Sequence, residues 1–266
     1  MVLWLALYAT AAIAIAILMQ RLRTRIAPRV YQAPVDRLNA TVEDLHRVFG
    51  AQNVKAATNL KLRVITTSTS APLKLGGAPD FLVTEQWPAC RTCKLPMTFI
   101  AQLPVGPEAL IRYPVIGRLF VFLCNSKAAK CETWAPTSGG SSVFVQPNGQ
   151  PSLPVPVPHP TMLLSKEYAV DTQVLPSVRV PKRANAEQDR YGAAVHMRFQ
   201  VQVGGFADWV QEPIEINCSC GSPTELLMQF ETFDEVIRLG EAGRAYVFGC
   251  KARHAPDAFF LEWQSV

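Results

Sequence analysis

The chain has 266 residues, of which 49% are hydrophobic and 18% are charged, and its formal net charge is +5. A chain of this length forms one large domain or two small ones, and its apolar content is sufficient for a sizeable core. The charged fraction lies below the roughly 25% that is usual for globular domains. The excess positive charge is small and scattered, so composition does not indicate a nucleic-acid partner.

The N-terminus has the composition of a membrane-spanning segment. Residues 2–19 carry no charge. Four arginines follow this segment closely: Arg21, Arg23, Arg25 and Arg29. A stretch of this length is near the lower limit for a transmembrane helix. A cleaved signal peptide would carry positive charge before its apolar stretch. We therefore predict an uncleaved, single-pass anchor.

The position of these arginines also predicts an orientation. Positive charge stays on the inner side of a membrane, so the C-terminal domain is expected on the cytoplasmic or matrix side. We favour the mitochondrial inner membrane over a bacterial inner membrane. Such compartments are reducing, so the seven cysteines are expected to be metal ligands or free thiols rather than disulfides.

A short helix and a strand follow the basic flank. Thr41 can cap the helix, Glu43 and Asp44 lie in its first turn, and Gly50 ends it. Residues 60–67 alternate apolar and polar side chains, as a strand does. The helix lies in a connecting segment, and the strand leads into the first of two repeats.

Two segments of about sixty residues, 76–134 and 204–263, carry the same ordered pattern. Each begins with Gly-Gly and an aspartate, continues with a close pair of cysteines, and has a glutamine nine residues after the second cysteine. Gly-Arg then precedes an apolar run that ends in cysteine, and a tryptophan closes the unit. Residues 232–241 suit a helical turn or two. Short apolar or alternating runs predict strands over 97–103, 119–124, 225–230 and 245–250.

A linker dense in proline separates the repeats. Prolines alternate with other residues over 147–160, which favours an extended strap lying along a surface, with disorder as the alternative. The chain is therefore expected to contain an anchor with a basic flank (1–30), a connecting segment with the short helix (31–59), repeat 1 (60–134), the proline-rich strap (135–194) and repeat 2 (195–266).

The cysteines are placed alike in the two repeats and carry the strongest chemical signal. Repeat 1 has the knuckle Cys90-x-x-Cys93, then Cys124 at the end of a predicted strand and Cys131 in the next turn. Four thiolates in two pairs suit a tetrahedral zinc ion.

Repeat 2 offers a second ligand set. Cys218 and Cys220 form its knuckle, Cys250 ends the matching strand, and His254 follows four residues later. Three thiolates and one imidazole are equally usual for structural zinc, which is borderline soft and needs no redox change. Because no ligand position is left open, we predict one or two structural zinc ions rather than a catalytic metal.

Two other interpretations of the cysteines remain open. Free cysteines are often small buried apolar residues. Cys90 and Cys93 also have the spacing of a thiol–disulfide redox pair. Such a pair would open a helix, and the neighbouring Pro88 and Pro96 do not favour a helix start.

The remaining sequence offers no catalytic constellation. It has no phosphate-binding loop, no dinucleotide-binding glycine fingerprint and no nucleophile elbow. Asp80 and Asp208 follow the Gly-Gly pairs, where we expect them to cap backbone amides in tight turns rather than to bind a ligand. We therefore predict no enzyme activity, no catalytic or cofactor-binding residue, no small-molecule substrate and no nucleic-acid partner.

The order of these motifs resembles programmed cell death protein 2 and the related YwqG-like proteins of bacteria. The resemblance covers residues 60–266. It implies a duplicated, mostly antiparallel β fold with pseudo-twofold symmetry. Together with the predicted helices, this gives an α+β class with one added N-terminal transmembrane helix. The eukaryotic relatives act as dedicated chaperones of a ribosomal protein. This chain lacks their additional zinc-finger insertion between the repeats.

The sequence thus predicts a non-catalytic, membrane-anchored protein-binding module. Its expected partners are other subunits of a larger membrane complex, of which it would be an accessory subunit, of the respiratory-chain type. The lipid bilayer would contact residues 2–19. Two alternatives are a membrane-tethered chaperone for a specific client protein and a thiol–disulfide redox protein that uses Cys90 and Cys93.

Overall fold

The computed structural model describes residues 40–266 except 68–69, 81, 84–86, 128, 150–155, 160–162, 197–199 and 255–257. By internal contacts the chain divides into two units, residues 1–39 and residues 40–266. All helices and strands with assigned bounds belong to the second unit.

The second unit is built on one sheet of eleven strands. The strands are β1 (Val54–Ile65), β2 (Lys74–Gly76), β3 (Thr98–Gly106), β4 (Ile111–Arg112), β5 (Gly117–Leu123), β6 (Ser141–Pro147), β7 (Glu167–Val178), β8 (Val201–Gly204), β9 (Thr224–Glu231), β10 (Arg244–Cys250) and β11 (Phe259–Gln264). Their order is β11-β10-β9-β8-β1-β7-β2-β3-β5-β6, with β4 beside β3 outside this path. Every pairing is antiparallel except that of β3 with β4.

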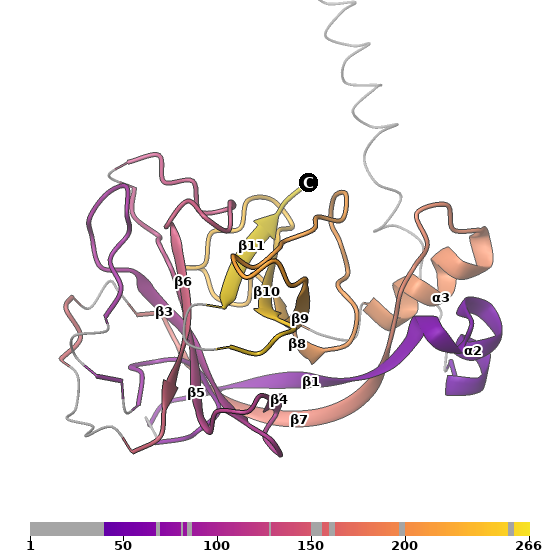
Figure 1. Ribbon diagram of the computed structural model, residues 1–266, viewed down its shortest axis with the longest axis horizontal. Coiled ribbons are helices and arrows are strands. Elements are labelled where there is room, and N and C mark those ends of the chain that lie inside the picture. The colour runs from indigo at the N-terminus through magenta and orange to yellow at the C-terminus, as the bar shows by residue number, and fades with distance from the viewer. Residues whose placement is uncertain are drawn as a thin grey trace, which may run out of the picture. The chain divides into compact units, whose positions relative to one another are not determined.

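The strand order has the same arrangement when it is read from either end. β1 and β7 lie in the centre, β2, β3, β5 and β6 follow on one side, and β8 to β11 follow on the other. In Figure 1, β1 and β7 form a long ribbon from which the other strands rise. We call β1 to β6 the first half and β7 to β11 the second half. The leading strand of each half pairs with the other half, β1 with β8 and β7 with β2.

The main apolar core contains side chains of both halves. Leu103 and Val121 come from the first half, Met228 and Val247 come from the second, and all four are fully buried in one cluster. Because successive side chains of a strand point to opposite faces, the same strands have a second face. On that second face, each half packs against loops of its own.

The end strands β6 and β11 also come together, so the sheet curls around the core. Ser141 Oγ donates a hydrogen bond to the Leu261 carbonyl over 3.4 Å. The indole Nε1 of Trp263 donates to Thr133 Oγ1 over 3.1 Å, and Trp134 packs edge-on against Trp263 with 6.3 Å between ring centroids. We call this contact between the halves the seam.

Short helical elements pack at one end of the β1–β7 ribbon. They are α2 (Val42–Phe49), the 3-10 turn η1 (Ala51–Asn53) and α3 (Ala186–His196). Thr41 and Asp44 form a capping box at the start of α2. Leu45 of α2 is buried against Val178 of β7 and Val195 of α3, and this apolar contact fastens both helices to the ribbon.

The α+β class predicted from the sequence is wrong. In the described residues, α2 has 8 residues and α3 has 11, whereas the sheet forms the body of the protein. Residues 232–241 form turns instead of a helix. The Asp234 carboxylate accepts the N–H groups of Val236, Ser165 and Lys166 and so holds these turns in place. The protein is mostly antiparallel β.

The predicted single-pass membrane placement is also corrected. No helix in the described part of the chain is long and apolar enough to cross a membrane; about 20 residues are needed. The predicted anchor, residues 2–19, lies outside the described residues. The transmembrane helix, the contact with a lipid bilayer and the mitochondrial location are therefore without support.

The segment predicted as a proline-rich strap, residues 135–194, contains regular structure. It supplies β6, the central strand β7 and most of α3. Residues 150–155 and 160–162 of the strap lie outside the described residues. One of the two strands at the centre of the sheet thus comes from the segment that the sequence predicts to be an extended strap.

The repeated Gly-Gly pairs lie where the chain passes closely over β7 and the residue before it. Gly76 has a φ of +70°, and a Cβ there would lie 2.1 Å from the Lys166 carbonyl oxygen. Gly205 has a φ of +76°, and a Cβ there would lie 2.6 Å from Ser177 Oγ. Both the backbone conformation and the lack of space require glycine at these positions.

The repeated glutamines hold the loops that follow the Gly-Gly pairs. Gln102 and Gln229 are both fully buried. Gln102 Oε1 accepts the N–H of Asp80 over 2.7 Å, and Gln229 Oε1 accepts the N–H of Asp208 over 2.9 Å. Each amide nitrogen also donates to a nearby backbone carbonyl. The fixed distance between the second knuckle cysteine and this glutamine therefore serves loop anchoring.

Replacing either glutamine by leucine is expected to destabilise the protein. Each of Gln102→Leu and Gln229→Leu removes the partners of a backbone N–H and a backbone C=O, at roughly 1–3 kcal/mol for each buried group left unpaired. Urea unfolding measures the free energy of unfolding. Gln173→Leu, at an exposed position of β7, is the control and should change it little. Equal losses in all three variants would contradict the anchoring role.

Candidate metal centres

The first centre lies under the loop between β2 and β3. An isolated bridge between Ala89 and Pro96 closes a tight turn that carries Cys90 and Cys93. The turn is completed at Lys94, which has a left-handed φ of 63° and donates its N–H to the Cys90 carbonyl over 2.9 Å. This backbone geometry, rather than a helix start, forms the first knuckle.

Two further cysteines complete the first cluster. Cys124 directly follows β5, and Cys131 lies in the next loop. The sulfur atoms of Cys90, Cys93, Cys124 and Cys131 all lie within 4.8 Å of one another, and those of Cys93 and Cys124 are 3.7 Å apart. The cluster packs against an aromatic group that includes Phe122.

The second centre has the same construction in the second half. Gly221, with a φ of +81°, donates its N–H to the Cys218 carbonyl over 2.8 Å and closes the knuckle as Lys94 does in the first. The Cys218 sulfur lies 3.1 Å from His254 Nε2, and the Cys220 and Cys250 sulfurs are 3.6 Å apart. All four ligand atoms lie within 4.8 Å of one another.

The structure thus brings the eight predicted ligands together in two clusters, each of which could hold a metal ion. All seven cysteines are free thiols. Each cluster combines a knuckle before β3 or β9 with ligands at or after the end of the antiparallel partner strand, β5 or β10. The antiparallel pairings of β3 with β5 and of β9 with β10 place these ligands at the same end of the sheet.

Hydrogen bonds divide the thiols of each centre by acidity. Burial acts to raise the pKa of Cys90, but the N–H groups of Cys93 and Thr92 outweigh it and lower the value to about 7. Burial raises the pKa of Cys131 to about 11. In the second centre, the hydroxyl and N–H of Ser222 lower the pKa of Cys220 to about 6. A bound metal would displace the remaining protons, as it must for thiolate ligation.

Exposed cations lie close in sequence to the ligands of both centres. Lys251 and Arg253 are near the second centre. Four cations lie within three residues of a ligand of the first: Arg91, Lys94, Lys127 and Lys130. With one divalent cation bound, four thiolates would give the first centre a net charge of −2, and three thiolates would give the second centre a net charge of −1. These cations have the sign that would offset such a charge, and more of them lie near in sequence to the centre with the larger excess.

Both centres also contact the opposite half. The Tyr113 hydroxyl of the first half donates to the carbonyl of His254 over 3.1 Å, and its ring packs against Phe259 of β11. The loop of Cys131 continues into Thr133, which accepts the Trp263 bond of the seam. Each of these ligand-bearing loops therefore fastens one half to the other.

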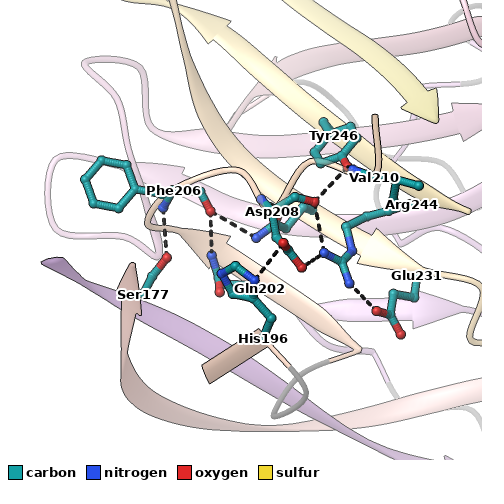
Figure 2. Close-up of polar contacts among 10 residues, drawn as sticks. Ser177, His196, Gln202, Phe206, Asp208, Val210, Glu231, Arg244 and Tyr246 are labelled. Carbon is teal, nitrogen blue, oxygen red and sulfur yellow. Dashed lines mark hydrogen bonds and ion pairs between the residues drawn. The ribbon is translucent and has the colours of Figure 1, made fainter. Parts of the chain in front are cut away.

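A cluster of charged side chains lies beside the second Gly-Gly pair, and sequence reasoning missed it. In Figure 2, Asp208 lies between His196, at the end of α3, and Arg244 of β10. His196 Nδ1 is 2.7 Å from an Asp208 carboxylate oxygen. Arg244 forms ion pairs with Asp208 and with Glu231 of β9. Tyr246 donates its hydroxyl to the Asp208 carbonyl over 2.8 Å.

This cluster fastens the loop after β8 to the second half. The sequence predicts that Asp208 caps backbone amides of its own turn. In the structure, the Asp208 carboxylate instead contacts His196 of α3 and Arg244 of β10. The equivalent Asp80 also accepts from outside its turn, from the N–H of Ala71 over 3.1 Å and from Lys74 over 3.4 Å. The recurrence of Gly-Arg and of the aspartate in the repeats was the available signal for Arg244.

Partly buried His196 is neutral at pH 7. Its side chain is 16% exposed, and burial, followed by the Arg244 cation, lowers the pKa of His196 to about 4. Neutral imidazole can donate its Nδ1–H to the Asp208 carboxylate. The contacts of Asp208 with His196, Arg244 and Tyr246 hold the loop in place.

The fold and these clusters define a mostly antiparallel β protein with two sulfur-rich centres suited to metal binding. Residues 73–253 match the family model described as a domain of unknown function, DUF1963. The match covers more than half of the chain, which therefore belongs to this family, the YwqG-like family. No curated protein shows a significant match to the chain.

The stability of the protein is expected to fall as the pH drops from about 6.5 to about 4. In this window the unfolded state binds a proton at His196 that the folded state does not bind. The stabilisation from the neutral imidazole is therefore complete above the unfolded pKa and is lost as the pH falls through the window to the folded pKa. The loss is about 1–3 kcal/mol. Urea unfolding at pH 7 and pH 5 of the wild type and His196→Gln measures it.

The variant should lose less stability than the wild type between these two pH values. His46→Gln, at an exposed position of α2, is the matched control and keeps the wild-type dependence. Both variants retain the cysteine clusters, so any effect of metal loss is common to all three proteins. An unchanged pH dependence in His196→Gln would contradict a buried neutral imidazole.

Proposed function

We propose that the chain is a non-catalytic protein-binding module whose two halves are stapled by zinc. The observation that carries this proposal is the pair of closed, four-ligand clusters at equivalent strand ends. Sets of four cysteines, or of three cysteines and one histidine, are the usual ligands of structural zinc. Zinc also suits thiolates because it is borderline soft and takes no part in redox chemistry.

Both centres supply a full tetrahedral set from the protein, which supports structure over catalysis. A catalytic zinc keeps one position for water or substrate. In the first centre, Cys90 is fully buried and Cys124 is 6% exposed, so solvent has little access to an ion there. The contacts of Tyr113 with His254 and of Thr133 with Trp263 extend the effect of each ion across the seam.

The β1–β7 ribbon supports a binding role. Only residues 57–60 of β1 pair with β8, and only residues 167–168 of β7 pair with β2. Among the described residues, the rest of each strand pairs with the other strand of the ribbon alone. Val64 is 51% exposed and Val174 is 69% exposed. Strand edges of this kind accept an extended segment of another protein.

The ribbon would serve a chaperone as well as an accessory subunit. The resemblance to programmed cell death protein 2 favours a chaperone for a specific client, and the two roles differ in the lifetime of the complex. Thiol–disulfide exchange by Cys90 and Cys93 has less support. Both sulfurs face the further thiols of Cys124 and Cys131, and the knuckle does not open a helix.

The purified chain is expected to contain two zinc ions, and Cys93→Ser is expected to lose one of them. Elemental mass spectrometry measures the content, and thermal unfolding measures the consequence. A structural site contributes several kcal/mol, so Tm should fall by roughly 10 °C. Ser219→Ala, beside a ligand but not one itself, is the control. Full stability without bound metal would contradict the zinc staple.

Blocking the strand edge is expected to abolish partner binding. Lysine on an exposed edge opposes pairing with another strand, so Val174→Lys should reduce recovery of the native partner at least tenfold. Val42→Lys places the same charge on exposed α2 and should retain the partner. Cross-linking at native expression levels, followed by sizing, provides the measurement. Migration of the wild type alone would contradict a binding module.

A further inference from the structure

The two centres differ in their access to solvent. In the second centre, Cys218 and Cys250 are buried, but Cys220 and His254 are exposed. In the first centre none of the four cysteines is exposed. The first cluster is also covered by a larger apolar group, which includes Trp87, whereas among the described residues the apolar group of the second adds only Ala258 and Phe260. Cys220 is therefore the ligand thiol that is most accessible to a small oxidant in solution.

The partner that Cys220 needs for a disulfide is adjacent. Its sulfur lies 3.6 Å from that of Cys250, so a movement of about 1.5 Å would bring the pair to bonding distance. Cys250 is fully buried and is shielded from direct attack. In the first centre the Cys93 and Cys124 sulfurs are as close, at 3.7 Å. The two centres therefore differ in the solvent exposure of their cysteines and not in the distance between the sulfur atoms.

We propose that Cys220 is an oxidation site through which hydrogen peroxide empties the second metal centre while the first keeps its ion. This inference rests on the proposed occupancy by zinc. The Cys220 thiolate attacks one peroxide oxygen, the O–O bond breaks, and the products are a sulfenic acid and, after protonation, water. The Cys250 thiolate then attacks the Cys220 sulfur, forms the disulfide and expels hydroxide, which solvent protonates to a second water.

The two thiolates lose two electrons in forming the disulfide, and these electrons reduce one hydrogen peroxide to two waters. The metal loses two of its four ligands and retains only Cys218 and His254, which do not hold structural zinc. Its release also frees the His254 segment, whose carbonyl accepts the Tyr113 bond from the first half. Oxidation of the second centre thus weakens a contact between the halves, and a thiol reductant with zinc restores it.

Graded hydrogen peroxide added to the zinc-loaded full chain tests the proposal. Released zinc is followed with a colorimetric chelator, and disulfides are mapped by mass spectrometry after non-reducing digestion. One of two ions should leave at least tenfold faster than the other, together with a bond between Cys220 and Cys250. Equal release of both ions, or a first disulfide within the other centre, would overturn the proposal.

Matched variants separate access from ligation. Cys220→His retains a fourth ligand but removes the exposed thiol, so its second ion should leave at least tenfold more slowly than in the wild type. Cys93→His makes the same exchange in the first centre and should leave the fast phase unchanged. Disulfide mapping of the wild type decides the matter if a variant fails to fold. A chain purified without zinc would contradict the proposed function as well, whereas two ions lost at equal rates would contradict this inference alone.

Discussion

The antiparallel pairing of β1 with β7 is the contact on which the rest of the structure depends. The two strands pair over twelve residues each, and each then passes to the other half for its outer neighbour. Neither half can complete its sheet without a strand from the other. The core between them, with Val121 from one side and Val247 from the other, follows from this exchange, and so does the meeting of β6 and β11 at the seam.

The two halves use the same loop in different chemical surroundings. In both, a buried glutamine accepts the N–H of the aspartate after Gly-Gly, and the aspartate side chain binds a cation. In the first half that cation is Lys74 of β2, which also pairs with Glu167 of β7 over 3.0 Å. In the second half it is Arg244 of β10. The hydrogen bond from the aspartate N–H to the glutamine depends on the position of the glutamine in its strand and is common to both halves. The cation that pairs with the aspartate can come from any neighbouring strand.

The metal centres act on the same architecture from the ends of the strands. Each half covers its second face with a knuckle, and each knuckle cluster is linked to the opposite half by a hydrogen bond. The first cluster is linked through Thr133, which accepts from Trp263, and the second through His254, whose carbonyl accepts from Tyr113. The proposed ions therefore stabilise both the loop that holds them and the closure of the sheet. Because Cys220 is exposed, the contact between the halves at the second centre is the one that we expect an oxidant in solution to affect. The proposed structural site and the proposed oxidation-sensitive site thus share one duplicated arrangement.

The sequence by itself determined the local parts of this protein. Cysteine spacing predicted both ligand sets, because a knuckle and the end of the adjacent antiparallel strand are close in any such hairpin. The ordered repeat likewise indicated the YwqG-like family. Tertiary structure decided what depends on distant partners. The place of β7 in the centre of the sheet, drawn from a proline-rich segment, depends on pairing with β1 more than one hundred residues away. The ion pairs of Asp208 with His196 and Arg244 likewise join three separate elements. Local patterns do not encode such contacts, since they depend on which strands become neighbours.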